Sequence, residues 1–390
     1  MVKVKSWLFT EVRGKVKKAE FRRRKNKVTE LSQKRIPFNP RTPAQQEVRK
    51  AYGQCVEEWN KLSESEKREW RIVGTLLGIS GYNAFMRECI SEKLGAVWYE
   101  ITIDNSANSN DLTDYQILLE IVNDSTFFED CKNEQKYLEF YDTDKATLLN
   151  HFVEEFDTTN KNAKIWIKVP SIPANASKTI YLKINTRRTE DLSNPDAVFD
   201  LYDDFLGDAL DTNKWEVVAG TQYQVADGLL KITNTDVKIL SIKTFSENVM
   251  LELLIKCVSR AKDGYTAGGF WKSTTDGISY LLHEARDYIR NDDTWNGLAD
   301  ILVPSNVWCK LIFTAYFDGT SHTVNIKAIR LDTNEVVYEG DWSNTVSDEK
   351  VLLSRRADDG YTGEAYEGYW DWIRVRKYTK PEPTVSYSKA

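Results

Sequence analysis

The sequence predicts a mainly β protein with a basic, partly helical N-terminal region. Apolar residues recur at helical spacing up to about Leu94-Gly95, and beyond that point they alternate with a period of two. After residue 203, predicted strands recur roughly every ten residues, with Asp-Gly turns between them. An aromatic content of 12%, including 12 Trp, suits folded β domains rather than disorder. We therefore predict two consecutive β domains after a basic arm and a small helical bundle.

A chain of 390 residues is long enough for several domains, each with its own core. The changes in composition and periodicity predict five segments. These are a basic arm (1–38), a three-helix bundle (39–95), a first β domain (96–202), a second β domain (203–379) and a C-terminal tail (380–390).

Charge is distributed unevenly along the chain. The first fifty residues hold sixteen Lys and Arg against four Glu, so their net charge is +12, and the remainder carries −18 of the total of −6. The densest basic run is Arg22, Arg23, Arg24 and Lys25. Such an arm contacts nucleic acid phosphates, forms a hairpin with solvated charges, or docks on acidic neighbours as an assembly tail. The acidic helices that follow favour the assembly tail, because they would repel a phosphate backbone.

Three helix starts can be read directly from the sequence. Thr42 and Gln45 form a capping box with Pro43 at the first helical position, and Ser63 and Glu66 form a second box. Ser80 is placed to cap a third helix. Apolar and aromatic residues at helical spacing follow each cap, which predicts a bundle with an aromatic core.

The cysteines and the hydropathy pattern restrict the location. Five scattered cysteines (Cys55, Cys89, Cys131, Cys257 and Cys309) show no metal-ligand spacing, and we expect them to be reduced, mostly buried thiols. The first residues contain no apolar leader, and no run of about eighteen apolar residues exists for a membrane span. Surface-type domains without an export signal predict a protein made in the cytoplasm and displayed on a virion or an extracellular surface.

The N-terminal segment carries two resemblances. Glu11–Lys15, Asn39–Gln46 and Ser80–Phe85 resemble parts of short proteins found among phage and prophage structural genes. Trp59–Ser63 with Trp70 is similar to the second and third helices of a high-mobility-group box, which implies DNA bending. The basic first helix of that box is not evident here, and the bundle is acidic.

The first β domain resembles the family called domain of unknown function 2341. The matching stretches are Leu112–Gln116, Leu138–Phe140, Ala163–Pro170, Ile172–Ala174 and Lys178–Tyr181. The resemblance implies a β-sandwich without catalytic activity.

The second β domain resembles concanavalin-like, or laminin-G-like, jelly rolls. Leu201–Glu216 looks like the entry to such a domain, and Tyr369–Tyr378 looks like its last strand. The resemblance implies a second sandwich in which Asp371 occupies the position that holds a structural calcium ion. We expect no required cofactor beyond such an ion.

Some proteins of this fold are glycoside hydrolases, which need two carboxylates about 5–5.5 Å apart for the retaining reaction. The nearest candidate here is the stretch His283–Asp287. Glu284 and Asp287 are three residues apart, so in a strand their side chains point to opposite faces. His151, His283 and His322 are too dispersed for a triad or a metal cluster. We therefore predict that the protein is not an enzyme.

Binding of carbohydrate is the alternative that the composition favours. If Glu284–Arg290 is extended, period two places Arg286, Tyr288 and Arg290 on one face, because alternate side chains share a face. The predicted glycan-binding set is Tyr265, Trp271, Arg286, Tyr288, Arg290, Trp295 and Tyr361. Aromatic rings stack on sugars, and guanidinium groups bind hydroxyls or carboxylates. The alternative for these aromatic residues is that they fill the sandwich or an oligomer interface.

The resulting hypothesis is a non-enzymatic adhesin or structural protein of a virion or a surface, whose jelly roll binds cell-surface glycans. Its expected partners are glycans, other subunits of the assembly and further copies of itself. The alternatives are a nucleic-acid-associated structural protein, acting through the arm and the bundle, and a glycoside hydrolase.

Overall fold

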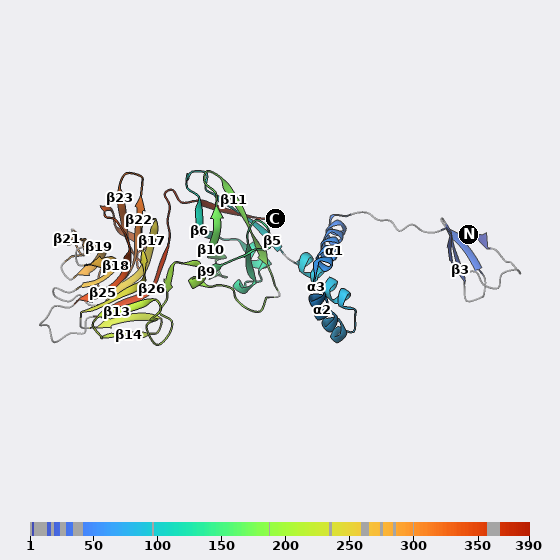
Figure 1. Ribbon diagram of the computed structural model, residues 1–390, viewed down its shortest axis with the longest axis horizontal. Coiled ribbons are helices and arrows are strands. Elements are labelled where there is room, and N and C mark those ends of the chain that lie inside the picture. The colour runs from blue at the N-terminus through green and yellow to red at the C-terminus, as the bar shows by residue number, and fades with distance from the viewer. Residues whose placement is uncertain are drawn as a thin grey trace. The chain divides into compact units, whose positions relative to one another are not determined.

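The computed structural model describes residues 2–3, 14–16, 19–23, 29–33, 42–95, 97–186, 188–233, 236–258, 265–273, 276–283, 286–298, 300–356 and 367–390. The chain divides into two compact units, Met1–Leu94 and Gly95–Ala390 (Figure 1). The second unit is built from antiparallel sheets, and helices are confined mostly to the first. The predicted mainly β class is confirmed.

The basic N-terminal region contains short strands. They form a four-stranded sheet in the order β1-β4-β3-β2, from β1 (Val2–Lys3), β2 (Gly14–Val16), β3 (Ala19–Arg23) and β4 (Thr29–Gln33). Arg22 and Arg23 lie in β3, whereas Arg24 and Lys25 lie outside the described residues.

The three predicted helices are present, and their start signals act as expected. They are α1 (Pro43–Lys61), α2 (Glu64–Leu77) and α3 (Gly81–Gly95). Thr42 Oγ1 accepts a hydrogen bond from the Gln45 amide at 3.3 Å, and Ser63 forms a complete capping box with Glu66. Ser80 Oγ accepts from the Asn83 amide at 3.1 Å. Each side-chain oxygen satisfies an amide that the first helical turn leaves without a partner.

The bundle core corrects the expectation that every cysteine is reduced. Cys55 on α1 and Cys89 on α3 form a disulfide, with 5.8 Å between their Cα atoms. Phe85 and Met86 are buried beside it, and Trp59 and Trp70 pack against them. The two cysteines are 34 residues apart, so only helix packing brings them together. Cys131, Cys257 and Cys309 are reduced and buried, as predicted.

The first sandwich consists of a three-stranded and a five-stranded sheet. The former has the order β6-β10-β9 and the latter β27-β5-β11-β7-β8. The elements are β5 (Val97–Asp104), β6 (Leu112–Ile121), α4 (Ser125–Asp130), β7 (Leu138–Tyr141), β8 (Leu148–Leu149), β9 (His151–Asp157), β10 (Asn162–Ile172) and β11 (Ser177–Ile184). Alternate residues of β5, including Ile101 and Ile103, are fully buried in the core, as period two requires.

The C-terminal residues are not a tail, contrary to the prediction. Thr384–Lys389 forms strand β27, which pairs antiparallel with β5 and so belongs to the first sandwich. Val385 and Tyr387 pack against the core of that sandwich. Two alternating apolar residues after a Pro-rich stretch are a weak strand signal. The segment forms a strand because β5 provides hydrogen-bond partners for its backbone.

The jelly roll consists of two large antiparallel sheets that enclose one core. The first has the order β14-β15-β26-β17-β22-β23-β24, with β12 also on β26, and the second the order β13-β16-β25-β18-β19-β20-β21. Its elements before the site region are α5 (Pro195–Val198), β12 (Leu201–Asp203), β13 (Trp215–Ala219), β14 (Tyr223–Ala226), β15 (Leu229–Thr233), β16 (Val237–Phe245) and β17 (Val249–Cys257). Those after it are β22 (Trp308–Phe317), β23 (His322–Arg330), β24 (Glu335–Ser343), β25 (Glu349–Arg356) and β26 (Glu367–Lys377).

One buried carboxylate connects the two ends of the entry stretch of the jelly roll. Asp203 accepts hydrogen bonds from the Trp215 indole at 2.6 Å and from the Phe205 amide at 2.8 Å. The Trp215 ring is buried in the core. The acid and the Trp of the entry stretch therefore pair with each other inside the jelly roll.

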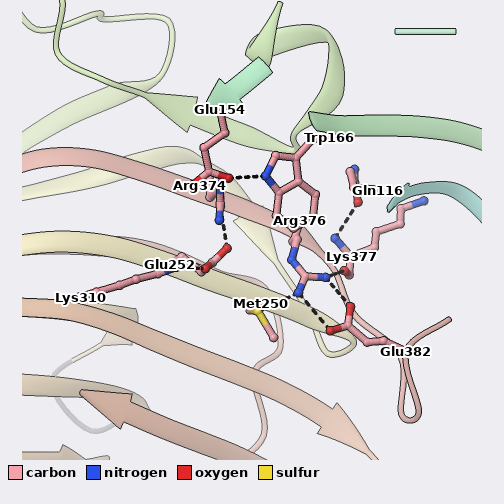
Figure 2. Close-up of polar contacts among 10 residues, drawn as sticks. All are labelled: Gln116, Glu154, Trp166, Met250, Glu252, Lys310, Arg374, Arg376, Lys377 and Glu382. Carbon is pink, nitrogen blue, oxygen red and sulfur yellow. Dashed lines mark hydrogen bonds and ion pairs between the residues drawn. The ribbon is translucent and has the colours of Figure 1, made fainter. Parts of the chain in front are cut away.

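Charged side chains join the two sandwiches at β26 (Figure 2). Arg374 Nη1 contacts Glu154 of β9 at 2.8 Å, and Arg374 Nε contacts Glu252 of β17 at 2.6 Å. The Trp166 indole of β10 donates to Glu154 at 2.5 Å, and the Arg374 guanidinium lies 4.7 Å from the Trp166 ring. We call this set the junction.

Candidate functional site

The predicted glycan-binding residues gather on one side of a four-strand meander. Its strands are β18 (Tyr265–Ser273), β19 (Asp276–His283), β20 (Tyr288–Asn291) and β21 (Thr294–Gly297). Phe270, Ile278 and Ile289 point into the core, so their alternate neighbours point to the opposite side. We call that side the aromatic face, defined by Tyr265, Trp271, Tyr288, Arg290 and Trp295.

Three rings of the aromatic face meet around Trp295. Its ring centroid lies 5.5 Å from that of Tyr265 and 5.9 Å from that of Tyr288, and both contacts are edge-to-face. Trp295 is on the edge strand β21 and is 43% exposed. An exposed Trp that two Tyr rings hold in place offers a rigid apolar surface at low entropic cost.

Trp271 does not offer such a surface, contrary to the expectation that it stacks on sugar. It is only 8% exposed and packs with Leu240 and Leu352. The Lys238 ammonium lies 4.2 Å from its ring centroid, and the Arg290 guanidinium lies 4.5 Å from it. Trp271 therefore supports the two cations instead of contacting a ligand directly.

The cations above Trp271 are held partly out of water. Burial lowers the pKa of Lys238, and the neighbouring charge of Arg290 lowers it further. Burial also lowers the pKa of Arg290. A cation that has already lost part of its hydration loses less on contact with a polar ligand, so these groups are suited to binding hydroxyl or carboxylate oxygens.

β19 ends at His283 and β20 begins at Tyr288, and the two strands pair as a hairpin. The prediction of one extended strand over Glu284–Arg290 is therefore wrong. Arg286 still reaches the face, because a Cβ built on Gly297 would lie 2.8 Å from Arg286 Cδ and 3.2 Å from Tyr288 Cε1. Tyr361 and Glu284 lie outside the described residues.

Two residues of this region were not among the predicted glycan-binding residues. His283 lies 5.2 Å, ring to ring, from Tyr288, and Lys238 comes from β16. The pairing of β18 with β19 sets His283 opposite Tyr265, which a single sequence does not reveal. The period of two within β16 could have marked Lys238, but only its pairing with β25, and of β25 with β18, brings it to Trp271.

The carboxylate considered for catalysis has a structural role. Asp287 is fully buried and accepts hydrogen bonds from the Tyr280 hydroxyl at 3.2 Å and from the Val303 amide at 3.1 Å. These bonds hold the turn before β20 against the segment that follows β21. A carboxylate enclosed in this way is not placed to contact a substrate.

Asp371, the predicted calcium ligand, lies half-buried in β26. Burial raises its pKa, and the nearby charge of Asp204 raises it further. Within the ranges that the structure describes, no three His, Cys, Asp or Glu side chains form a group that could hold a metal ion. Calcium at Asp371 stays a prediction.

Comparison with protein families supports one of the resemblances. Residues 134–218 match the model of a family described as a domain of unknown function (DUF2341). The match covers well under half of the chain and runs from just before β7 to β13, so it crosses from the first sandwich into the jelly roll. Leu112–Gln116, part of the resemblance from sequence, lies before the matched stretch.

Solved structures with similar sandwiches are glucanases and related proteins. A prokaryotic β-1,3-1,4-glucanase (lichenase) from a mouse hindgut metagenome is 15% identical with a TM-score of 0.35, over 45% of this chain and 98% of that one. An endo-β-1,3-glucanase from Pyrococcus furiosus is 14% identical with a TM-score of 0.34, over 47% of this chain and 95% of that one. Neither similarity is high enough to support a conclusion about activity.

No curated protein matches the chain. Among the described helices, none is long and apolar enough to cross a membrane.

Proposed function

We propose that this protein is a non-enzymatic, surface-displayed binding protein whose jelly roll binds carbohydrate through the aromatic face. The observation that carries the proposal is Trp295, an exposed ring held by Tyr265 and Tyr288 beside Arg290 on the adjacent strand. A sugar has an apolar ring face bordered by hydroxyls, so its site needs exposed aromatic rings next to fixed donors. Large exposed apolar groups on a folded domain otherwise need an explanation.

The proposed location is a virion or an extracellular surface. The Cys55–Cys89 disulfide supports it, because disulfides persist mainly in oxidising surroundings. The strongly basic N-terminal stretch on an otherwise acidic chain supports docking on other subunits of an assembly. Display in many copies would also compensate for weak single sites, since linked sites gain avidity without new contacts.

The test is a glycan array probed with the full chain on a multivalent carrier. We expect binding in the millimolar to micromolar range per site, about 4–8 kcal/mol, amplified by the carrier. Trp295→Ala should strongly reduce the array signal. The matched control is Trp308→Ala, which removes a half-buried ring stacked by Lys256 on the other sheet and should leave binding unchanged.

Two results would count against the proposal. One is an array without any signal for the wild type, which would make the aromatic face a scaffold or an oligomer contact. The other is release of reducing sugar from a bound glycan, which would make the protein a glycoside hydrolase.

The role of the basic arm is tested separately. We propose that residues 1–38 dock on acidic subunits, and replacing Arg22, Arg23, Arg24 and Lys25 by Ser should then weaken assembly. Binding of duplex DNA by the full chain, with a steep loss between low and physiological salt, would favour the nucleic-acid alternative instead.

A further inference from the structure

A cavity lies where the first sandwich meets the jelly roll, apart from the aromatic face. Its volume is about 660 Å³, within the range of roughly 300–1,000 Å³ that small-molecule sites occupy. Its walls come from residues 109–113 of the first sandwich, the turn between β22 and β23, and the residues at the end of β26. No residue of the aromatic face lines it.

The walls of this cavity are fixed by the contacts that join the sandwiches. Arg376 binds Glu382 through two contacts of 2.5 and 3.1 Å, and the Tyr115 hydroxyl donates to the same carboxylate at 2.9 Å (Figure 2 shows the Arg376 pair). The Lys377 amide donates to Gln116 Oε1 at 3.0 Å. Because these contacts already hold the walls in place, binding of a ligand costs little further ordering of the protein.

Aromatic rings form one part of the wall. The rings of Tyr316 and Tyr378 lie 5.9 Å apart, centroid to centroid. Phe317 is 45% exposed and stacks on His322 with centroids 4.6 Å apart. These rings provide apolar surface of the kind that packs against the C–H face of a sugar.

The polar groups that remain available in the cavity are neutral. Within the described part of the chain, the side-chain amides of Asn110 and Asn248 and the hydroxyl of Tyr378 make no hydrogen bond. Amides and hydroxyls both donate and accept, which matches the mixed hydrogen bonding of sugar hydroxyls.

The charged groups of the cavity already have partners. Lys377 donates to the Thr113 carbonyl at 2.7 Å, and Lys380 donates to the Tyr316 hydroxyl at 2.9 Å. Asp318 accepts from the amides of Thr320 and Ser321 at 2.9 and 2.8 Å. An ionic ligand would have to displace these contacts, whereas a neutral ligand would not.

We propose that this cavity binds one unit of a neutral saccharide, which both sandwiches recognise together. The first sandwich contributes the Asn110 amide, and the jelly roll contributes Asn248, Tyr378 and the rings. The first sandwich is then part of a ligand site and not only a spacer. This site is independent of the aromatic face, so either can fail without the other.

The test is calorimetric titration of the full chain with glucose, galactose, mannose and N-acetylglucosamine. Asn110→Ala, Tyr378→Phe and Asn248→Gly should each weaken binding of the sugar about tenfold, as expected when one hydrogen bond to the sugar is lost. Glycine is chosen for position 248 because Asn248 has a φ of 64°, which alanine rarely adopts. Unchanged thermal unfolding of each variant would show that the fold is intact.

Trp308→Ala is the control, because Trp308 lies outside the lining of the cavity and outside the aromatic face, and it should leave this binding unchanged. Three results would overturn the proposal. The first is no heat with any of the four sugars at millimolar concentration. The second is sugar binding that Trp295→Ala abolishes and the cavity variants retain, which would assign all binding to the aromatic face. The third is displacement of the sugar by inorganic phosphate or sulfate, which would make the cavity an anion site.

Discussion

Two regions of the β unit contain the same arrangement, a Trp ring contacted by two cations, and differ in what surrounds it. At the junction, Arg374 and Arg376 lie 4.7 and 5.2 Å from the Trp166 ring centroid. On the aromatic face, Lys238 and Arg290 lie 4.2 and 4.5 Å from that of Trp271. Both Trp rings are buried.

The carboxylates distinguish the two regions. Arg374 pairs with Glu154 and Glu252, and the charges of the junction are balanced. Lys238 has no carboxylate within ion-pair distance among the described residues, and Arg290 lies close enough to lower its pKa. The Trp with two cations at the junction is therefore a structural joint that two carboxylates complete, whereas Lys238 beside Trp271 lies on a candidate binding surface.

The largest expected effect is at the junction. Arg374→Met leaves Glu154 without its cation and Glu252 with Lys310 alone, and it should lower the free energy of unfolding by about 3–5 kcal/mol. The measurement is urea denaturation followed by Trp fluorescence. A loss below about 1 kcal/mol would show that the junction is no stronger than a surface ion pair.

The stability of the protein should depend on pH in opposite directions at two buried carboxylates, Glu252, which has cationic partners, and Glu349, which has no ion-pair partner among the described residues. Burial alone would raise the pKa of Glu252, but the charges of Arg374 and Lys310 lower it to about 2. Glu349 is fully buried with no hydrogen-bond partner for either oxygen among the described residues, and burial, with Asp276 and Asp292, raises its pKa to about 8. Because the pKa of Glu349 is higher in the folded than in the unfolded state, its contribution to stability is fully present at acidic pH and is lost as the pH rises.

Glu349→Gln is the matching experiment. The wild type should lose stability between about pH 4.5 and pH 8, and each unit of pKa difference corresponds to about 1.4 kcal/mol. The variant should lack this loss and be more stable than the wild type at pH 9. Parallel profiles of the two proteins from pH 5 to pH 9, measured by thermal unfolding, would contradict the assignment.

Substitutions on the aromatic face should change glycan binding more than they change the stability of the fold. Trp271→Phe keeps an aromatic support below Arg290 and should weaken glycan binding about threefold, less than the loss expected for Trp295→Ala. Binding isotherms on a glycan that the array identifies provide the measurement. A larger effect from Trp271→Phe than from Trp295→Ala would show that the exposed ring is not the main contact.

The smallest effect is expected for Lys238→Met. The loss of a cation–π contact of about 0.5–1 kcal/mol is offset by relief of the repulsion from Arg290. Stability should therefore change by less than about 1 kcal/mol, which is the direct counterpart of Arg374→Met. A loss as large as that of Arg374→Met would remove the distinction between the two regions.

Local pattern predicted much of the fold. The cap residues Thr42, Ser63 and Ser80 mark the three helices, because each cap acts within one turn of its own helix. The resemblance to a jelly roll placed the last strand at Tyr369–Tyr378, within a few residues of β26. The sequence did not predict β27, whose two alternating apolar residues become a strand only beside β5.

Of the candidate site, the sequence by itself determined the residue types and the neighbourhood of Tyr265, Tyr288, Arg290 and Trp295, because they lie on strands joined by short turns. Only the tertiary structure decided that Trp271 is covered, that Lys238 reaches it and that Cys55 joins Cys89. It also decided that Arg374 meets Glu154, 220 residues away. These outcomes depend on sheet pairing and domain contact between distant segments, and burial and charge partners are properties of that packing.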